Sequence, residues 1–138
     1  MSITTTHITD YVYNARNDSG HAARIDMREG DKEHLGPMEL VLSALSGCVA
    51  VEVALMIKKR RKTLEAMEIR AEGDRRENPP RSYTAIRLHF VITSPDAQEN
   101  ELKKIISLSL DKYCSVADSL KADIATSCEI RRALIDKE

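Results

Sequence analysis

Apolar and polar residues alternate along the first part of the chain, which is the pattern of β-strands. Residues 3–13 alternate β-branched or aromatic side chains with polar ones, and residues 21–27 repeat the pattern. Between them, residues 14–20 are rich in turn-forming Asn, Asp, Ser and Gly, and a polar loop with two glycines follows over 28–36. We therefore expect two N-terminal strands joined by a turn.

The longest apolar stretch begins at Pro37 and predicts a helix that runs to about Lys62. Proline suits a first helical turn, because its missing N–H has no partner there in any case. Residues 40–57 are apolar on nearly all sides, which is typical of a buried helix, and the cations of 58–62 face the negative end of the helix dipole. The uncharged run 40–51 is shorter than the roughly 20 residues that cross a bilayer, so we expect no membrane span.

Alternation returns at residues 67–74 and 82–93, on either side of a linker that contains two prolines. This spacing predicts a pair of antiparallel strands. Ser94 and Pro95 then predict the N-cap and first position of a helix that continues to about Tyr113.

A short capped helix over 115–120 and a final strand over 122–135 complete the prediction. The order ββ-α-ββ-α-α-β indicates an α+β fold in which the long helix packs on a sheet. We expect one domain over residues 1–138.

Composition narrows the class of protein. With 138 residues, 42% hydrophobic and 31% charged, the chain has enough apolar material for a core. The 21 Lys and Arg residues are balanced by 22 Asp and Glu, so the chain lacks the basic excess typical of nucleic-acid binders. We see no secretion signal, and an odd number of widely spaced cysteines favours the reducing cytoplasm.

The three cysteines are the candidates for chemistry. Cys48 lies within the apolar helix and Cys128 within the last strand, where a buried cysteine usually serves as a small hydrophobic residue. Cys114 lies at a junction between two helices, where a helix N-terminus stabilises a thiolate. The four histidines are scattered, and metal-binding and nucleotide-binding motifs are missing, so we expect neither a metal nor another cofactor.

Two motifs carry a family resemblance. GPMELVLSALSGC at 36–48 and DKYCSV at 111–116 resemble the OsmC/Ohr family of osmotically induced and organic hydroperoxide resistance proteins. The resemblance covers nearly the whole chain, and the separation of 66 positions from Cys48 to Cys114 suits the family. The GPMEL form and the lysine-rich helix end are most similar to the YhfA-like branch.

The resemblance implies an intertwined homodimer, with antiparallel sheets wrapped on a long central helix and two active sites at the interface. It implies that Cys48 is the peroxidatic nucleophile and Cys114 the resolving cysteine. An arginine before the helix stabilises the thiolate in this family. Arg28 matches its place in the OsmC branch, and Arg16 matches its place in the Ohr branch; we favour Arg28.

One position departs from the family pattern. A glutamate that holds the arginine usually follows the proline of the first motif, and here Met38 stands there. Glu39 is one residue later, and Glu52 lies one helical turn beyond Cys48, so either carboxylate is a candidate for that role.

The implied function is a cytoplasmic thiol-dependent peroxidase that reduces organic hydroperoxides in oxidative-stress defence. It needs no cofactor and is reset by a dithiol, which in this family is often a lipoylated protein. We expect no nucleic-acid or membrane partner. The alternative from another class is a non-catalytic dimer that binds a small hydrophobic ligand, and a third reading is a structural domain with three core cysteines.

Overall fold

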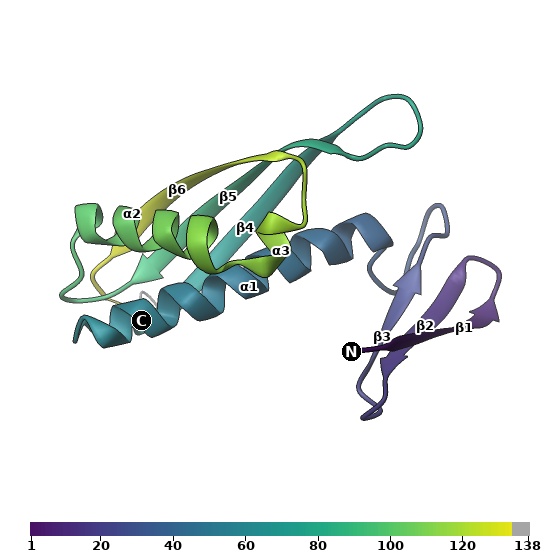
Figure 1. Cartoon of the computed structure of the whole chain (residues 1–138), viewed down its shortest axis with the longest axis horizontal. Coiled ribbons are helices and arrows are strands. Elements are labelled where there is room, and N and C mark those ends of the chain that lie inside the picture. The colour runs from purple at the N-terminus through teal and green to yellow at the C-terminus, as the bar shows by residue number, and fades with distance from the viewer. Residues whose placement is uncertain (134–138) are drawn as a thin grey trace. The chain divides into compact units, whose positions relative to one another are not determined.

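The computed structural model describes residues 1–133. The chain forms two compact units, one over residues 1–41 and one from residue 42 onward (Figure 1). Helix α1 (Pro37–Lys59) begins in the first unit and continues into the second. The expectation of one domain over the whole chain stays a prediction, and so does the homodimer.

The first unit holds an antiparallel sheet of three strands, β1 (Ile3–Thr9), β2 (Val12–Asn17) and β3 (Ala22–Asp26), with β2 in the centre. The prediction of two strands is wrong here. A tight turn at Asp10 and Tyr11, where Tyr11 has a φ of 67°, divides the expected first strand. Strand alternation continues on both sides of this turn, so the pattern alone did not reveal it.

Helix α1 begins at Pro37 as predicted and ends at Lys59. The prediction that it is buried on all sides is wrong for the single chain. One stripe is fully buried, with residues four apart along the helix: Leu45, Val49, Val53 and Ile57. On other faces Val51 is 59% exposed and Leu55 is 48% exposed. The helix is therefore apolar on a surface that residues 1–133 leave partly uncovered.

By length and composition alone, α1 is able to cross a membrane. The sequence-based expectation that the apolar run is too short counted only the residues between two glutamates, whereas the helix continues through Glu52. Such a helix is weak evidence for a span, because the core helix of a globular protein passes the same test. Its buried stripe packs in the core of the second unit.

The second sheet has the order β4-β5-β6. Strands β4 (Ala66–Arg75) and β5 (Tyr83–Thr93) are antiparallel, as predicted. Strand β6 (Asp123–Arg131) pairs with β5 in parallel, so this sheet is mixed and not purely antiparallel. The physical reason is the long helical connection between β5 and β6, which carries the chain back to the starting end of the sheet.

The core of the second unit is built on alternate residues of β5, which are all at most 1% exposed: Ile86, Leu88, Phe90 and Ile92. They pack with the α1 stripe and with helix α2 (Glu99–Leu108). Helix α2 starts four residues later than predicted. The Ser94 hydroxyl accepts a hydrogen bond from the Ala97 N–H at 3.0 Å, so it closes a turn before the helix instead of capping the helix itself.

A π-helical turn, η1 (Ser109–Tyr113), and the short helix α3 (Ser115–Asp118) follow α2. The α+β class is confirmed, with one more N-terminal strand than predicted and with the π turn added. The last strand ends at Arg131, and the end of the range predicted for it lies outside the described residues.

Candidate functional site

Cys48 lies in the middle of α1 and is half-buried, beside the fully buried Val49. The residue before it, Gly47, has no neighbouring atom within 4 Å of the point that a Cβ would occupy. The helix surface at Gly47 is therefore open, whereas Cys48 itself packs against the core beside the buried stripe. A partly accessible thiol on a rigid helix is a suitable position for a nucleophile.

Cys114 lies where the π-helical turn η1 ends and α3 begins. Its side chain is 4% exposed, and its Sγ accepts a hydrogen bond from the Ala117 N–H at 3.3 Å. The thiol is thus the N-cap of α3. π-helical turns are rare and occur often at functional sites, because they displace the following residues from a regular helical path.

The fold brings the two thiols together although they are 66 residues apart in the sequence. Burial raises the pKa of the Cys114 thiol above its usual value, and a hydrogen bond with the Cys48 side chain raises it further. The backbone N–H of Ala117 acts in the opposite direction. Both thiols are free, with no disulfide between them.

This result corrects one expectation. The position of Cys114 at a helix start predicted a stabilised thiolate, but the net direction of its pKa is upward. The cost of burying a charged sulfur outweighs one backbone hydrogen bond to it. Cys114 is therefore held as a neutral thiol next to Cys48. Cys128, in β6, packs against the core and its pKa is also raised by burial, which agrees with the predicted packing role.

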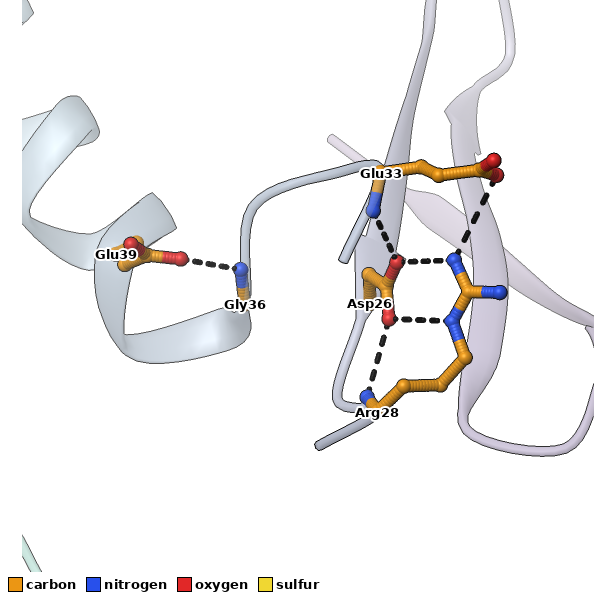
Figure 2. Close-up of polar contacts among 5 residues, drawn as sticks. All are labelled: Asp26, Arg28, Glu33, Gly36 and Glu39. Atoms are coloured by element: carbon orange, nitrogen blue, oxygen red, sulfur yellow. Dashed lines mark hydrogen bonds and ion pairs between the residues drawn. The ribbon is translucent and has the colours of Figure 1, made fainter. Parts of the chain in front are cut away.

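In the first unit, Arg28 is held by a carboxylate that the sequence analysis did not single out. Asp26, the last residue of β3, is fully buried and accepts hydrogen bonds from Arg28 Nε at 3.0 Å and Nη2 at 2.6 Å (Figure 2). Glu33 lies 3.6 Å from the same Nη2. The Arg28 guanidinium holds the pKa of Asp26 well below its usual range, and Asp26 in turn raises the pKa of Arg28.

Glu39 has a different contact. Its Oε1 accepts a hydrogen bond from the backbone N–H of Gly36 at 2.9 Å, directly before the first residue of α1 (Figure 2). This is one half of a capping box, in which the third helical residue satisfies the N-cap amide. Glu39 therefore fixes the start of the helix that carries Cys48.

The alternate candidates, Arg16 and Glu52, have no comparable ion-pair partner among the described residues. Arg16 is an exposed residue of β2, and Glu52 is half-buried on α1, one turn after Cys48. Within residues 1–133 neither side chain makes an ion pair. Cys48 and Cys114 belong to one compact unit, whereas Arg28, Arg16 and Glu39 belong to the other.

Asp26 was missed because nothing in a single sequence marks it. It follows an alternating strand and precedes a polar loop, where an aspartate is ordinarily solvated. Its burial is visible only in the fold. Among the described residues, no group of three or more His, Cys, Asp or Glu side chains is arranged to hold a metal ion.

Comparison with known proteins gives matches along most of the chain. Residues 30–129 match the family model described as OsmC-like protein. Protein YhfA of Escherichia coli strain K12 is 40% identical over 99 residues, which cover 72% of this chain and 73% of YhfA.

Solved structures match over nearly the full length. An OsmC-like protein from Mycoplasma pneumoniae superposes with a TM-score of 0.81 at 24% identity, covering 94% of this chain and 96% of that one. An organic hydroperoxide resistance protein from Elizabethkingia anophelis superposes with a TM-score of 0.67 at 16% identity, covering 96% and 97%. At these identities the likeness shows the shared fold.

Proposed function

The chain belongs to the OsmC-like family. Solved structures with the same fold include organic hydroperoxide resistance proteins, and we propose that this protein is a thiol-dependent peroxidase that reduces organic hydroperoxides. The observation that carries the proposal is the pair of free thiols, Cys48 and Cys114, in contact within one unit. Core packing has no need of two thiols with complementary properties. Here Cys48 is half-buried, whereas Cys114 is buried and its pKa is raised.

The chemistry divides between the two cysteines. The Cys48 thiolate attacks the distal oxygen of the hydroperoxide, the O–O bond breaks, and the alkoxide leaves and takes up a proton to become an alcohol. Cys48 is then a sulfenic acid. The Cys114 sulfur attacks the Cys48 sulfur, a disulfide forms, and the sulfenic oxygen leaves as water after protonation.

A dithiol closes the cycle by exchange, so that its own sulfurs end as a disulfide and both cysteines are thiols again. We propose a protein-bound dithiol for this step, such as the lipoyl group that serves other members of the family. The three free cysteines suit work in the reducing cytoplasm.

Arg28 is proposed as the cation that stabilises the Cys48 thiolate, with Arg16 as its alternate. Its support is the preorganised guanidinium: an arginine whose fork is already fixed loses little freedom when it meets an anion. Glu39 is proposed to support the site by fixing the start of α1. Glu52 stays an alternate carboxylate on the face of α1 that carries Cys48.

A homodimer is proposed as the working form. Its support is the uncovered apolar surface of α1, with Val51 and Leu55 about half exposed or more, together with exposed Ile3 and Ile8 on β1. Exposed apolar side chains that line one element are characteristic of a protein interface.

The test counts thiols and measures intact mass after one equivalent of cumene hydroperoxide under anaerobic conditions. The proteins are the wild type, Cys48→Ser, Cys114→Ser and, as the matched control, Cys128→Ser. We expect the wild type and Cys128→Ser to lose two thiols each. Cys114→Ser should gain one oxygen on Cys48, and Cys48→Ser should keep its thiols.

Two results would contradict the proposal. If the wild type keeps all three thiols over minutes, the protein is not a peroxidase for this substrate class, and the non-catalytic ligand-binding dimer becomes the better reading. If Cys48→Ser reacts as fast as the wild type, the nucleophile is misassigned.

A further inference from the structure

The end of α2 carries a buried serine at a position where the helix pattern favours an apolar side chain. The buried face of α2 holds Leu102, Ile105 and Ile106, and Ser109 follows at the same helical spacing. Ser109 has no exposed surface. Burial of a hydroxyl is unfavourable unless it is hydrogen-bonded, so an alanine would occupy this position at a lower cost. A serine here therefore indicates a specific partner.

That partner is a residue of α1. The Ser109 hydroxyl donates a hydrogen bond to Met56 Sδ at 3.7 Å, and Met56 packs against the core. Met56 lies eight residues after Cys48 on the same helix. Because a helix is rigid over this length, the contact fixes the start of η1 relative to the helix that carries the Cys48 thiol.

The same segment meets α1 again at its other end. Cys114 directly follows η1 and is hydrogen-bonded with Cys48. Between the two contacts, Leu110 packs against the core, whereas residues 111–113 are exposed. The path of the exposed residues is therefore set by the contacts at either end of the turn and by α3, where the Ala117 N–H donates to Cys114 Sγ at 3.3 Å.

We propose that Ser109 is the positioning residue for Cys114. By binding Met56 it holds the start of η1 against α1, and so it keeps the Cys114 sulfur within reach of the Cys48 sulfur. The inference rests on the proposed function, in which Cys114 resolves the oxidised Cys48. Its effect falls on the second step alone, because Cys48 is carried by α1, whose own buried stripe fixes it in the core.

The test separates the two steps with one equivalent of dithiobis(nitrobenzoate), an aromatic disulfide, in a Cys128→Ser background without peroxide. The Cys48 thiolate attacks the reagent, one thionitrobenzoate leaves, and Cys48 carries a mixed disulfide. The Cys114 sulfur, after giving its proton to solvent, attacks the Cys48 sulfur, and the second thionitrobenzoate leaves as the Cys48–Cys114 disulfide forms. The rate of the first release rises with concentration, whereas the rate of the second does not.

The expected effects differ between the two releases. Ser109→Ala should slow the second release about fivefold, as expected for the loss of one hydrogen bond, and leave the first within about twofold of the background protein. Met56→Leu keeps the side-chain volume but removes the acceptor, and it should slow the second release similarly. The double variant should match Ser109→Ala within about twofold, because both changes remove the same contact. In urea, Ser109→Ala should unfold no more easily than the background protein, since a buried hydroxyl is removed.

Ser107→Ala is the matched control. It removes a hydroxyl two residues earlier, on the exposed side of α2, where Ser107 Oγ lies 3.5 Å from Asp111 Oδ2. Both releases should stay within about twofold of the background protein. The inference is overturned if Ser109→Ala leaves the second release unchanged, if Ser107→Ala slows it as much, or if the two single effects multiply in the double variant. Release of only one thionitrobenzoate by the background protein would also overturn it, because Cys114 then does not reach Cys48.

The reaction with peroxide keeps this inference separable from the proposed function. With excess cumene hydroperoxide, a slower second step leaves the Cys48 sulfenic acid open to a second hydroperoxide, which oxidises it to the sulfinic acid and becomes an alcohol. Ser109→Ala should therefore raise the fraction of protein that gains two oxygens in intact mass, and an unchanged fraction in a protein that reacts with peroxide would contradict the inference. If no cysteine reacts with peroxide, the proposed function fails, and the two releases of thionitrobenzoate still decide whether Ser109 positions Cys114.

Discussion

Two valines on α1 give a direct test of how this helix is buried. Val53 has no exposed surface, whereas Val51, two residues earlier on the same helix, is 59% exposed. The substitution Val→Ala removes the same two carbons at both positions, and it changes the intrinsic helix propensity by the same amount. Any difference in the free energy of unfolding therefore comes from burial.

The magnitude follows from the carbons removed. At Val53, two carbons at about 0.8 kcal/mol each give about 1.6 kcal/mol, and the cavity that remains raises the cost to about 2–3 kcal/mol. At Val51 the transfer cost is small in the isolated chain, and the better helix propensity of alanine offsets it by a few tenths of a kcal/mol. The expected difference between the two variants is therefore about 2 kcal/mol.

The assay is urea unfolding followed by circular dichroism, at protein concentrations about a hundredfold apart. Val53→Ala should lower the free energy of unfolding at every concentration. If a second copy covers Val51, Val51→Ala should lower the unfolding midpoint most at the higher concentration and so reduce its rise with concentration, because stabilisation by association grows with the ratio of concentration to Kd. An equal, concentration-independent loss for both variants would refute the assignment of Val51 to a surface that one chain leaves open.

Two further predictions concern backbone fit and acid stability. Gly73→Ala should lower the free energy of unfolding, measured in urea, by about 1–3 kcal/mol, because its Cβ would lie 2.5 Å from the Tyr83 ring. Gly47→Ala is the control, because its new Cβ has open space around it, and it should be neutral or stabilising. Similar effects for the two variants would contradict the packing at Gly73. Because the folded-state pKa of Asp26 lies below its unfolded value of about 3.9, its contribution to stability is present above about pH 4 and is lost as the pH falls further. Asp26→Asn should therefore flatten the decline of stability below pH 4, and an unchanged decline would show that Asp26 is not the group responsible.

Much of the fold was readable from local patterns. The start of α1 at Pro37, the antiparallel pair β4 and β5, and the short helix before β6 were predicted from periodicity and from capping residues. These features depend on a few neighbouring residues. The break at Asp10 and Tyr11 was not predicted, because a positive φ at a tyrosine has no reliable local signal.

The parallel pairing of β6 and the late start of α2 were also missed. Strand direction depends on where a long connection returns. The Ser94 hydroxyl accepts a hydrogen bond within the turn before the helix, and Gln98 is the N-cap of α2. Both are decided by packing and by alternative hydrogen bonds rather than by the propensity of single residues.

The α+β class, the family and the candidate cysteines Cys48 and Cys114 were predictable from the sequence, because each depends on a local pattern or a short motif. The tertiary structure decided which groups meet. It placed Cys114 against Cys48 and raised the pKa of Cys114. It also bound Glu39 to the Gly36 amide at the helix start and paired Arg28 with Asp26. These outcomes depend on desolvation and on contacts between distant residues, and a buried aspartate looks like any other aspartate until the chain has folded around it.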